Sequence, residues 1–115
     1  MDIKQVVMKV GVTPDQIRRW ERLGMIPPIM RDQNGIRNFK NRDVEWLEYA
    51  KLLNEMDVSP DFQIEYVKLV ELGKQAAPAR QDLINEQLDK LKDEHQCLLD
   101  RIKAMDTEVA KRQSA

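Results

Sequence analysis

Residues 13–39 read TPDQIRRWERLGMIPPIMRDQNGIRNF, and the rest of the chain is organised around this stretch. Thr13 is a preferred N-cap residue, Pro14 suits the first helical position, and Gln16 can complete a capping box with Thr13. Gly24 is the residue type that commonly closes a helix in the left-handed conformation. The stretch therefore predicts a capped helix that ends just before Gly24.

The predicted helix has one packing side and one basic side. At 100° per residue, Ile17, Trp20 and Glu21 lie on the side that would face the protein. The residues on the opposite arc are Arg18, Arg19 and Arg22. A helix that buries Ile17 and Trp20 would present three guanidinium groups to solvent, where such groups bind phosphates and guanine edges.

After this helix the sequence predicts a β-hairpin. Pro27 and Pro28 forbid helix and favour an extended connector. The dipeptide Asn34-Gly35 is a strong hairpin signal, because both residues tolerate the positive φ of a type I′ turn. The apolar residues that could anchor two short strands are Ile29, Met30, Ile36 and Phe39, and the basic residues expected on the rim are Arg31, Arg37 and Lys40. We call this hairpin (residues 29–40) the wing; a structural hairpin with incidental arginines is the alternative.

A short helix is also predicted before this stretch. Ile3, Val6, Val7 and Val10 follow the i, i+3, i+4, i+7 spacing of an amphipathic helix, and Asp2 is well placed to cap it. A very short Gly-Val turn then leads to the basic helix. Two short helices joined in this way predict a helix-turn-helix, with an ordinary αα-hairpin of charged outer face as the alternative.

Two further helices are predicted after the wing. Asn41 can cap the third helix. Its expected buried residues are Trp46, Leu47, Ala50, Leu53 and Met56. Ser59, Pro60 and Asp61 repeat the start chemistry for a fourth helix, which is expected to end at Gly73.

A linker is expected at residues 74–78, followed by the longest helix, over residues 79–115. Apolar residues recur there with the heptad spacing of a two-helix coiled coil. The a positions are Leu88, His95, Ile102 and Val109, and the d positions are Ile84, Leu91, Leu98 and Met105. A lone helix would leave this stripe in water, so we expect a second copy of the chain to cover it. Packing of this helix back onto the head is the alternative.

Charge is distributed unevenly along the 115 residues, although the formal net charge is only −1. Between residues 9 and 42, eight basic residues stand against three acidic ones, a local balance of +5. From residue 59 onward, nine basic residues face eleven acidic ones. A basic first part followed by a mildly acidic remainder is typical of nucleic-acid-binding proteins, and a solvated charged surface is the alternative.

The composition argues against several other classes of protein. Aromatic residues make up 5% and charged residues 34% of the chain, which favours helices over a large β core. No stretch approaches the ~18 apolar residues of a membrane span, and no signal peptide is recognisable, so we expect a soluble cytoplasmic protein. One His, one Cys and the lack of a Gly-rich phosphate loop argue against an enzyme, and no cofactor or metal is expected.

The order of these elements resembles the MerR family of bacterial transcription regulators. The segment VGVTPDQIRRWERLGMIPP resembles the family pattern G-V-S/T-x-x-x-L/I-R-Y-Y-E-R-x-G-L-I/L-x-P, and RDQNGIRNF resembles its wing pattern R-x-x-N-G-x-R-x-Y/F. These matches extend over nearly all of residues 3–73. The resemblance implies a mainly α protein with a winged helix-turn-helix head at residues 1–73, the linker, and a dimerisation helix that forms a two-helix coiled coil, antiparallel as in the family.

The resemblance also implies which residues contact DNA. It places Thr13, Arg18 and Arg19 on DNA, and Arg37 with its wing neighbours on the phosphate backbone. The full set expected at the interface is Thr13, Gln16, Arg18, Arg19, Arg22, Arg31, Asn34, Arg37, Asn38 and Lys40. Arg19 and Ile36 depart from the pattern, since the family usually has Tyr at both positions; this changes the expected contact of Arg19 and weakens any hydrogen bond expected of Ile36.

Within the family, the chain is similar to small aldehyde- or redox-responsive members, whose reactive cysteine matches Leu52 here. Leu52 has no nucleophile, so that mechanism cannot be transferred. The chain's one cysteine, Cys97, is expected to be a bystander on the helix surface. His95 lies two residues away and points elsewhere, which makes a poor metal site, so we interpret His95 as a polar residue of the seam with a pH-sensing role left open.

These features together predict a homodimeric, sequence-specific regulator that binds a pseudopalindromic operator in double-stranded DNA and distorts the promoter, acting indirectly on RNA polymerase. Two alternatives are an architectural, excisionase-like winged-helix protein and a coiled-coil adaptor that has lost DNA affinity. The long heptad helix argues against the first, and the clustered arginines argue against the second. The sequence does not identify an effector, the operator sequence or the choice between activation and repression.

Overall fold

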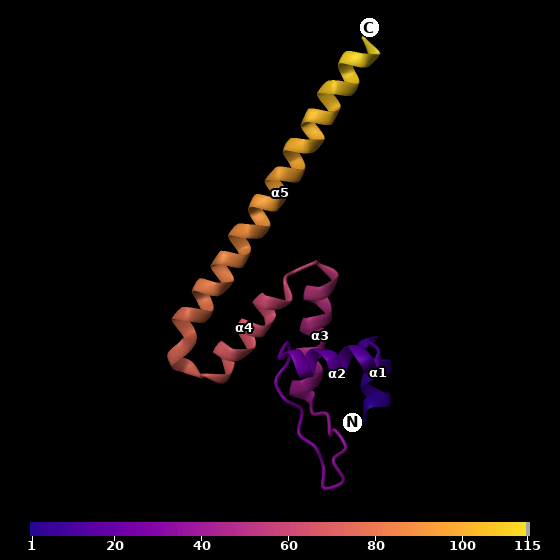
Figure 1. Cartoon of the computed structure of the whole chain (residues 1–115), viewed down its shortest axis with the longest axis vertical. Helices are drawn as coiled ribbons and strands as arrows, with labels where there is room; N and C mark the ends of the chain where they lie inside the picture. The colour runs from indigo at the N-terminus through magenta and orange to yellow at the C-terminus, as the bar shows by residue number, and fades with distance from the viewer. Residues whose placement is uncertain (115) are drawn as a thin grey trace. The chain divides into compact units, whose positions relative to one another are not determined.

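A computed structural model describes residues 1–114 (Figure 1). The elements in chain order are α1 (Ile3–Val10), α2 (Pro14–Leu23), α3 (Asn41–Glu55), α4 (Pro60–Glu71), the 3₁₀ helix η1 (Lys74–Ala76) and α5 (Ala77–Gln113). Within residues 1–114 there is no β-strand, only one antiparallel bridge in the wing. The chain divides into two compact units, Met1–Arg80 and Gln81–Ala115.

The ends of the first two helices have the caps that the sequence predicts. The Asp2 carboxylate accepts the Gln5 amide N–H at 2.9 Å, and the Gln5 side chain accepts the Asp2 amide at 3.0 Å. Thr13 and Gln16 form the same reciprocal pair at 3.1 and 2.9 Å. Gly24 ends α2 with φ of 81°, in the left-handed region. Local side-chain chemistry therefore fixes where α1 and α2 begin and where α2 stops.

The hydrophobic core of the first unit lies among α1, α2, α3 and the start of the wing. Helix α1 packs against α2 and α3. Ile17 and Trp20 are buried, at 0% and 5% exposed, as predicted for the packing side of α2. The other main core residues are Val6, Val10, Ile26, Ile29, Phe39, Val44, Leu47 and Ala50. This core holds α2 rigidly with its other side toward solvent.

Helix α3 differs from the sequence prediction at both ends. It begins with Asn41 as its first helical residue, and Lys40 occupies the cap position, so Asn41 is not the N-cap. The carboxylate of Asp43 accepts the Lys40 amide at 2.9 Å, which is the hydrogen bond that the third helical residue makes in a capping box. Met56, predicted to be buried, is 50% exposed at the C-cap position, just after the last helical residue, Glu55.

Residues 74–78 are more regular than a linker. Lys74–Ala76 form η1, and α5 starts at Ala77, two residues earlier than the predicted residue 79. Pro78 therefore lies in the first turn of α5, where a missing N–H costs nothing. The guanidinium of Arg80 donates to the carbonyl oxygen of Gly73 at 2.9 Å, which fixes this corner.

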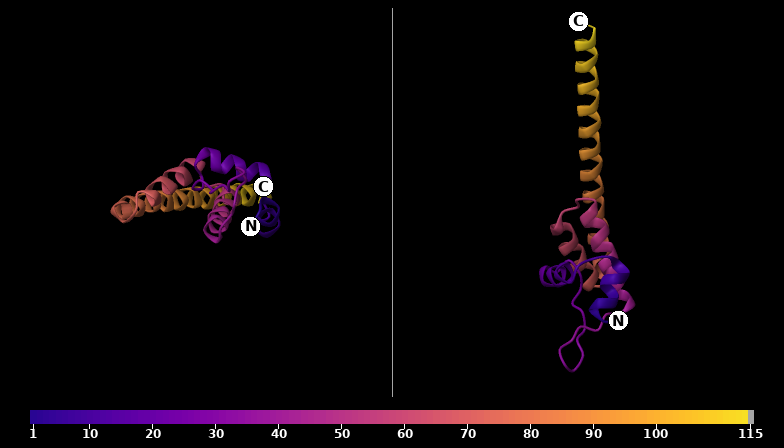
Figure 2. Two further views of the ribbon diagram at one scale, coloured as in Figure 1. Left: turned by 90° about the horizontal axis from the view of Figure 1, so that it is seen from below. Right: turned by 90° about the vertical axis from the view of Figure 1, so that its right-hand side faces the viewer.

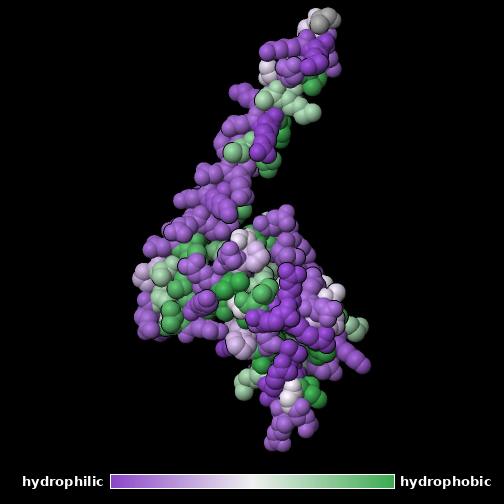
Figure 3. Space-filling model, in the orientation of Figure 1, coloured by the Kyte–Doolittle hydropathy of each residue, from purple (hydrophilic) through white to green (hydrophobic). Residues whose placement is uncertain are grey.

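In the second unit, α5 exposes a stripe of apolar residues. Five of the eight predicted seam residues are large and between 43% and 69% exposed, namely Leu88, Leu98, Ile102, Met105 and Val109. They contribute to the green, hydrophobic patches among purple ones along this helix in Figure 3. No helix within residues 1–114 is both long and apolar enough to cross a membrane.

Candidate nucleic-acid interface

The outer side of α2 carries three exposed arginines. Arg18, Arg19 and Arg22 all lie in solvent, opposite the buried Ile17 and Trp20. Arg18 Nη1 lies 3.1 Å from an Asp15 carboxylate oxygen, but the two side chains are 52% and 95% exposed, so this pair holds Arg18 only weakly. Within residues 1–114, Arg19 and Arg22 form no ion pair. All three guanidinium groups are thus available to a partner.

Thr13 and Gln16, also predicted at the interface, lie at the start of α2. Their side chains form the capping box, so both have a structural role that ties down part of their hydrogen-bonding capacity. The Thr13 side chain is exposed, and the hydroxyl that accepts the Gln16 amide still has its own proton to donate. An external acceptor next to the first turn of α2 can therefore be reached from Thr13 without breaking the cap.

The wing is a hairpin-like loop that projects from the helices of the first unit in both Figure 1 and Figure 2. Arg31 and Arg37 form its one β-bridge, so the two short strands that were predicted do not form. The bridge is reinforced by the Asn38 amide, which donates to the Met30 carbonyl oxygen at 2.8 Å. Met30 and Ile36, expected as apolar anchors, are 64% and 59% exposed.

The turn of the wing is not of type I′. That type needs a positive φ at both central residues, whereas Gly35 has φ of 79° and Asn34 is not among the described residues with positive φ. Instead the Gly35 amide donates to the Asp32 carbonyl oxygen at 3.0 Å, and the Asp32 carboxylate accepts the amides of Asn34 and Ile36 at 2.8 and 3.0 Å. This is a three-residue loop closed by a left-handed glycine and stabilised by an aspartate.

Glu21 joins the wing to α2. One carboxylate oxygen accepts the Ile29 amide at 2.8 Å, and the other accepts Nε of Arg37 at 2.9 Å and lies 2.8 Å from its Nη2. Nη2 of Arg31 lies 3.9 Å from the same oxygen. The side chains of Glu21 and Arg37 are only 14% and 19% exposed. The loop is therefore held in place by a largely buried ion pair.

This contact changes the interpretation of Arg37, which we predicted to lie on the rim of the wing. Its guanidinium is turned inward to Glu21, so its first role is to position the wing. Glu21 was missed as a site residue, although the sequence contained a signal for it. A carboxylate on the same helical side as Ile17 and Trp20 has to be paired when that side is buried, and the paired cation had to come from elsewhere in the chain.

The other predicted wing residues are exposed. Arg31 is 48% exposed and donates from Nη1 to the Gly35 carbonyl oxygen at 2.8 Å. Asn34, Asn38 and Lys40 lie in solvent, with Lys40 Nζ 3.6 Å from the Met30 sulfur. Of the ten residues predicted at the interface, three are exposed arginines on α2, and two are cap residues at the start of the same helix. Four are exposed polar or basic residues on the wing, and Arg37 lies in the joint between the wing and α2.

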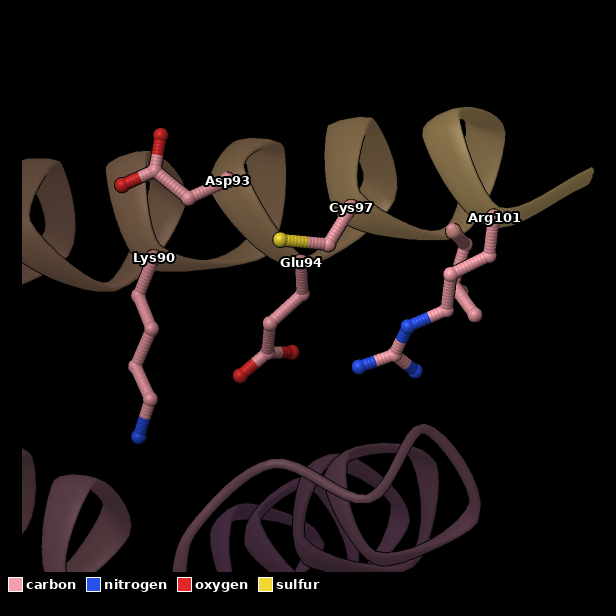
Figure 4. A pocket seen from close by; sticks show the side chains of 6 residues that line it. Lys90, Asp93, Glu94, Cys97 and Arg101 are labelled. Carbon is pink, nitrogen blue, oxygen red and sulfur yellow. The ribbon is translucent and has the colours of Figure 1, made fainter. Parts of the chain in front are cut away.

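Outside this region, the exposed thiol of Cys97 lies on α5. Figure 4 shows Lys90, Glu94 and Arg101 pointing to one side of the helix and Asp93 pointing to the other. Within residues 1–114 no group of three His, Cys, Asp or Glu side chains is placed to hold a metal ion. Leu52, at the position of the family's reactive cysteine, is 51% exposed on α3.

Known proteins share both the sequence and the fold. The family model described as MerR HTH family regulatory protein matches residues 1–62. The transcriptional regulator AdhR of Bacillus subtilis is 33% identical over 91 residues, which are 79% of this chain and 65% of AdhR. The mercuric resistance operon regulatory protein of Bacillus cereus is 35% identical over 54 residues, 47% of this chain and 41% of that protein. The chain thus spans less than two thirds of the length of these curated relatives.

Two solved structures have the same arrangement of elements. A MerR family regulator from Listeria monocytogenes superposes with a TM-score of 0.85 at 30% identity, covering 95% of this chain and 83% of that one. HiNmlR, described as a MerR family regulator lacking the sensor domain and bound to promoter DNA, gives a TM-score of 0.72 at 22% identity, covering 96% and 87%. These likenesses confirm the predicted fold class, a mainly α protein with a long C-terminal helix. With the family model matching more than half of its length, the chain belongs to the MerR family of helix-turn-helix regulatory proteins.

Proposed function

We propose that this protein is a homodimeric, sequence-specific DNA-binding transcription regulator that acts by distorting its operator or promoter. The observation that carries the proposal is the two-sided character of α2. Its inner side is locked into the core by Ile17 and Trp20, and its outer side holds three exposed arginines. Arginines on a rigid helix can lie in the major groove and bind guanine edges or phosphates through two N–H groups of the guanidinium at once.

The wing supplies the second half of the DNA contact. Glu21 fixes it to the same helix that carries the arginines, so groove-binding and phosphate-binding groups are held as one unit. Arg31, Asn34, Asn38 and Lys40 are exposed on it and suit contacts to the backbone. HiNmlR, which has the same fold, was crystallised on promoter DNA, and this supports the same mode of use here.

The homodimer is proposed from the exposed heptad stripe of α5. Ile102, for example, is 57% exposed and Met105 69% exposed, on a helix about 55 Å long at 1.5 Å per residue. A second copy, antiparallel as in the family, would bury both stripes together. Two heads related by a two-fold axis would read a pseudopalindromic operator. Bending a DNA site of about 20–30 base pairs costs about 1–6 kcal/mol, which the contacts of two heads and two wings would offset. RNA polymerase would then respond to the changed promoter.

Selection from a random double-stranded DNA library, followed by sequencing, tests this function. We expect the wild-type protein to enrich an inverted repeat and Arg18→Ala to lose it, with about 5- to 150-fold weaker binding to the selected site in fluorescence anisotropy. Arg101→Ala, which removes an exposed arginine from α5, is the matched control and should bind like wild type. Circular dichroism checks that each variant is folded.

Three results would count against parts of the proposal. A single half-site without a repeat would contradict the homodimer. Salt-sensitive binding without any motif would indicate an architectural protein, because phosphate contacts alone carry no sequence information. The absence of binding at moderate salt would overturn the DNA-binding function and leave α5, with its apolar stripe, as a site for a protein partner.

A further inference from the structure

A second concave site lies in the first unit, between α3 and α4, and uses none of the residues assigned to DNA. It has a volume of about 270 Å³ and is lined by Glu45, Trp46 and Tyr49 of α3 and Tyr66 of α4. The three aromatic side chains are half-buried, with the remainder of each ring surface open to solvent. This volume lies just below the range of about 300–1,000 Å³ of small-molecule pockets, so any ligand is the size of a head group.

The three rings pack against one another and line this cavity. The ring centroids of Trp46 and Tyr49 are 6.3 Å apart with planes at 26°. The Tyr66 ring lies 6.0 Å from Trp46 and 5.9 Å from Tyr49, with its plane turned by 60° and 86° to theirs. A cation in the cavity therefore lies beside all three rings. Each ring attracts it where the ring face is turned to the cavity and its centroid lies within about 6 Å.

The cage is supported from behind. Phe62, only 8% exposed, stacks on Tyr66 with centroids 5.9 Å apart and planes at 17°. Burial, and secondly the neighbouring Tyr66, raise the pKa of Tyr49 above its ordinary value, so this phenol is neutral at physiological pH. Rings that are held in place and uncharged present their negative faces to a ligand without adding a charge of their own.

We propose that this aromatic cage binds a small quaternary ammonium cation, such as a trimethylammonium group. Glu45 provides the complementary negative charge, and among the residues described as lining the cavity none is basic. A primary ammonium ion is strongly hydrated and would lose hydrogen bonds that three rings and one carboxylate replace poorly. A methylated cation has no such hydrogen bonds to lose and gains contact with all three rings.

Titrations of the full-length protein followed by NMR test this site. Choline is the probe, 3,3-dimethyl-1-butanol is its uncharged isostere, and ethanolamine is its unmethylated analogue, all at constant ionic strength. The readout is the indole N–H signal of Trp46, assigned with Trp46→Phe. The indole of Trp20, buried in the core, serves as an internal control. We expect a saturable shift of the Trp46 signal with choline and at least tenfold weaker binding of the other two compounds.

Two variants separate the cage from general charge effects. Glu45→Gln removes an exposed carboxylate that lines the cavity and should weaken choline binding several-fold without unfolding the protein. Glu71→Gln removes an exposed carboxylate of α4 that does not line it and should bind choline like wild type. Equal binding of choline and its uncharged isostere, no saturable shift at all, or equal weakening by both variants would each overturn the cation site.

The same head group also occurs on lipids, so phosphatidylcholine vesicles form a further arm of the experiment. We expect no co-sedimentation of the protein with them; co-sedimentation that Glu45→Gln abolishes would overturn a diffusible ligand in favour of a lipid. Cation binding involves neither α2 nor the wing. Loss of DNA binding in Arg18→Ala and loss of choline binding in Glu45→Gln are therefore separate results, and either function can fail without the other.

Discussion

Replacing Glu21 with alanine tests whether one carboxylate holds the wing on α2. In the native protein this carboxylate accepts the Ile29 amide at 2.8 Å and pairs with Arg37 through Nε at 2.9 Å and Nη2 at 2.8 Å. Shortening the side chain of residue 21 to alanine removes the hydrogen bond to Ile29 and the ion pair with Arg37 at once. It leaves the Arg37 guanidinium, whose side chain is only 19% exposed, without a counter-charge. The amide of Ile29, a residue 5% exposed, loses its acceptor as well.

The size of the effect follows from how deeply the pair is buried. Removing one member of a fully buried ion pair costs about 3–5 kcal/mol, whereas exposed pairs contribute about 0–1 kcal/mol. With side chains 14% and 19% exposed, the Glu21–Arg37 pair lies between these limits but nearer the buried one. We therefore expect Glu21→Ala to lower the free energy of unfolding by about 2–3 kcal/mol. Glu21→Gln keeps an acceptor for Ile29 and should lose about half as much.

Urea denaturation followed by both tryptophan fluorescence and circular dichroism measures this loss, and coincident transitions are required before the values are compared. Asp15→Ala is the matched control. It removes a carboxylate from the same helix at a similar distance, 3.1 Å from Arg18, but the side chains of that pair are 52% and 95% exposed. Its effect should stay within a few tenths of a kcal/mol. Equal losses in the two variants would refute the reasoning that burial of the Glu21 pair stabilises the wing.

Three further results are expected. Gly24→Ala should lower the free energy of unfolding by about 1–2 kcal/mol, because φ of 81° is costly for a residue with a Cβ. The added Cβ would not clash, since the nearest atom, Cγ2 of Ile64, is 3.9 Å away. Urea denaturation measures the loss, and an unchanged stability would mean that the helix end relaxes. Ile102→Asp should convert dimers to monomers in sedimentation equilibrium at micromolar concentration, since a charge would enter the seam; a persistent dimer would exclude this helix face as the interface. The pKa of Tyr49 is raised in the folded protein above its ordinary value of 10.0. As the pH rises past 10.0, the Tyr49 phenol therefore loses its proton in the unfolded chain first, and the free energy of unfolding falls. Tyr49→Phe should flatten that slope in pH-dependent melting curves, and identical slopes would contradict the raised pKa.

Local signals in the sequence predicted the fold well because they depend on neighbours in the chain. Asp2 and Thr13 cap their helices through residues only three positions away, so the geometry is nearly fixed once a helix starts. Gly24 closes α2 for a similar reason. The same reasoning failed at Asn41, which is the first residue of the helix and not its cap. Lys40 occupies the cap position, and the Asp43 carboxylate accepts its amide from the third position of the helix.

The turn of the wing shows a second limit. Asn34-Gly35 is compatible with a type I′ turn, but Asp32 accepts two amides in the loop that forms instead. Turn types differ by little in energy, so two hydrogen bonds to a carboxylate suffice to choose between them. Met56 illustrates a different case, in which helical spacing predicts burial but the side chain at the C-cap of α3 is 50% exposed.

The sequence was least informative about which arginines are paired within the protein and which are free to bind DNA. Clustering along the chain gave a local charge of +5, and we predicted that Arg37 would lie on the rim of the wing with Arg31 and Lys40. Glu21 and Arg37 are 16 residues apart, and their pairing depends on how the wing folds back onto α2, which no local pattern encodes. Because that pair is neutral and inward, it adds little to the field that attracts DNA. The salt dependence of DNA binding counts only the phosphates that cations neutralise. It should therefore reflect the free cations of α2 and the wing, such as Arg19, Arg22 and Lys40, and not the larger number of basic residues in the sequence.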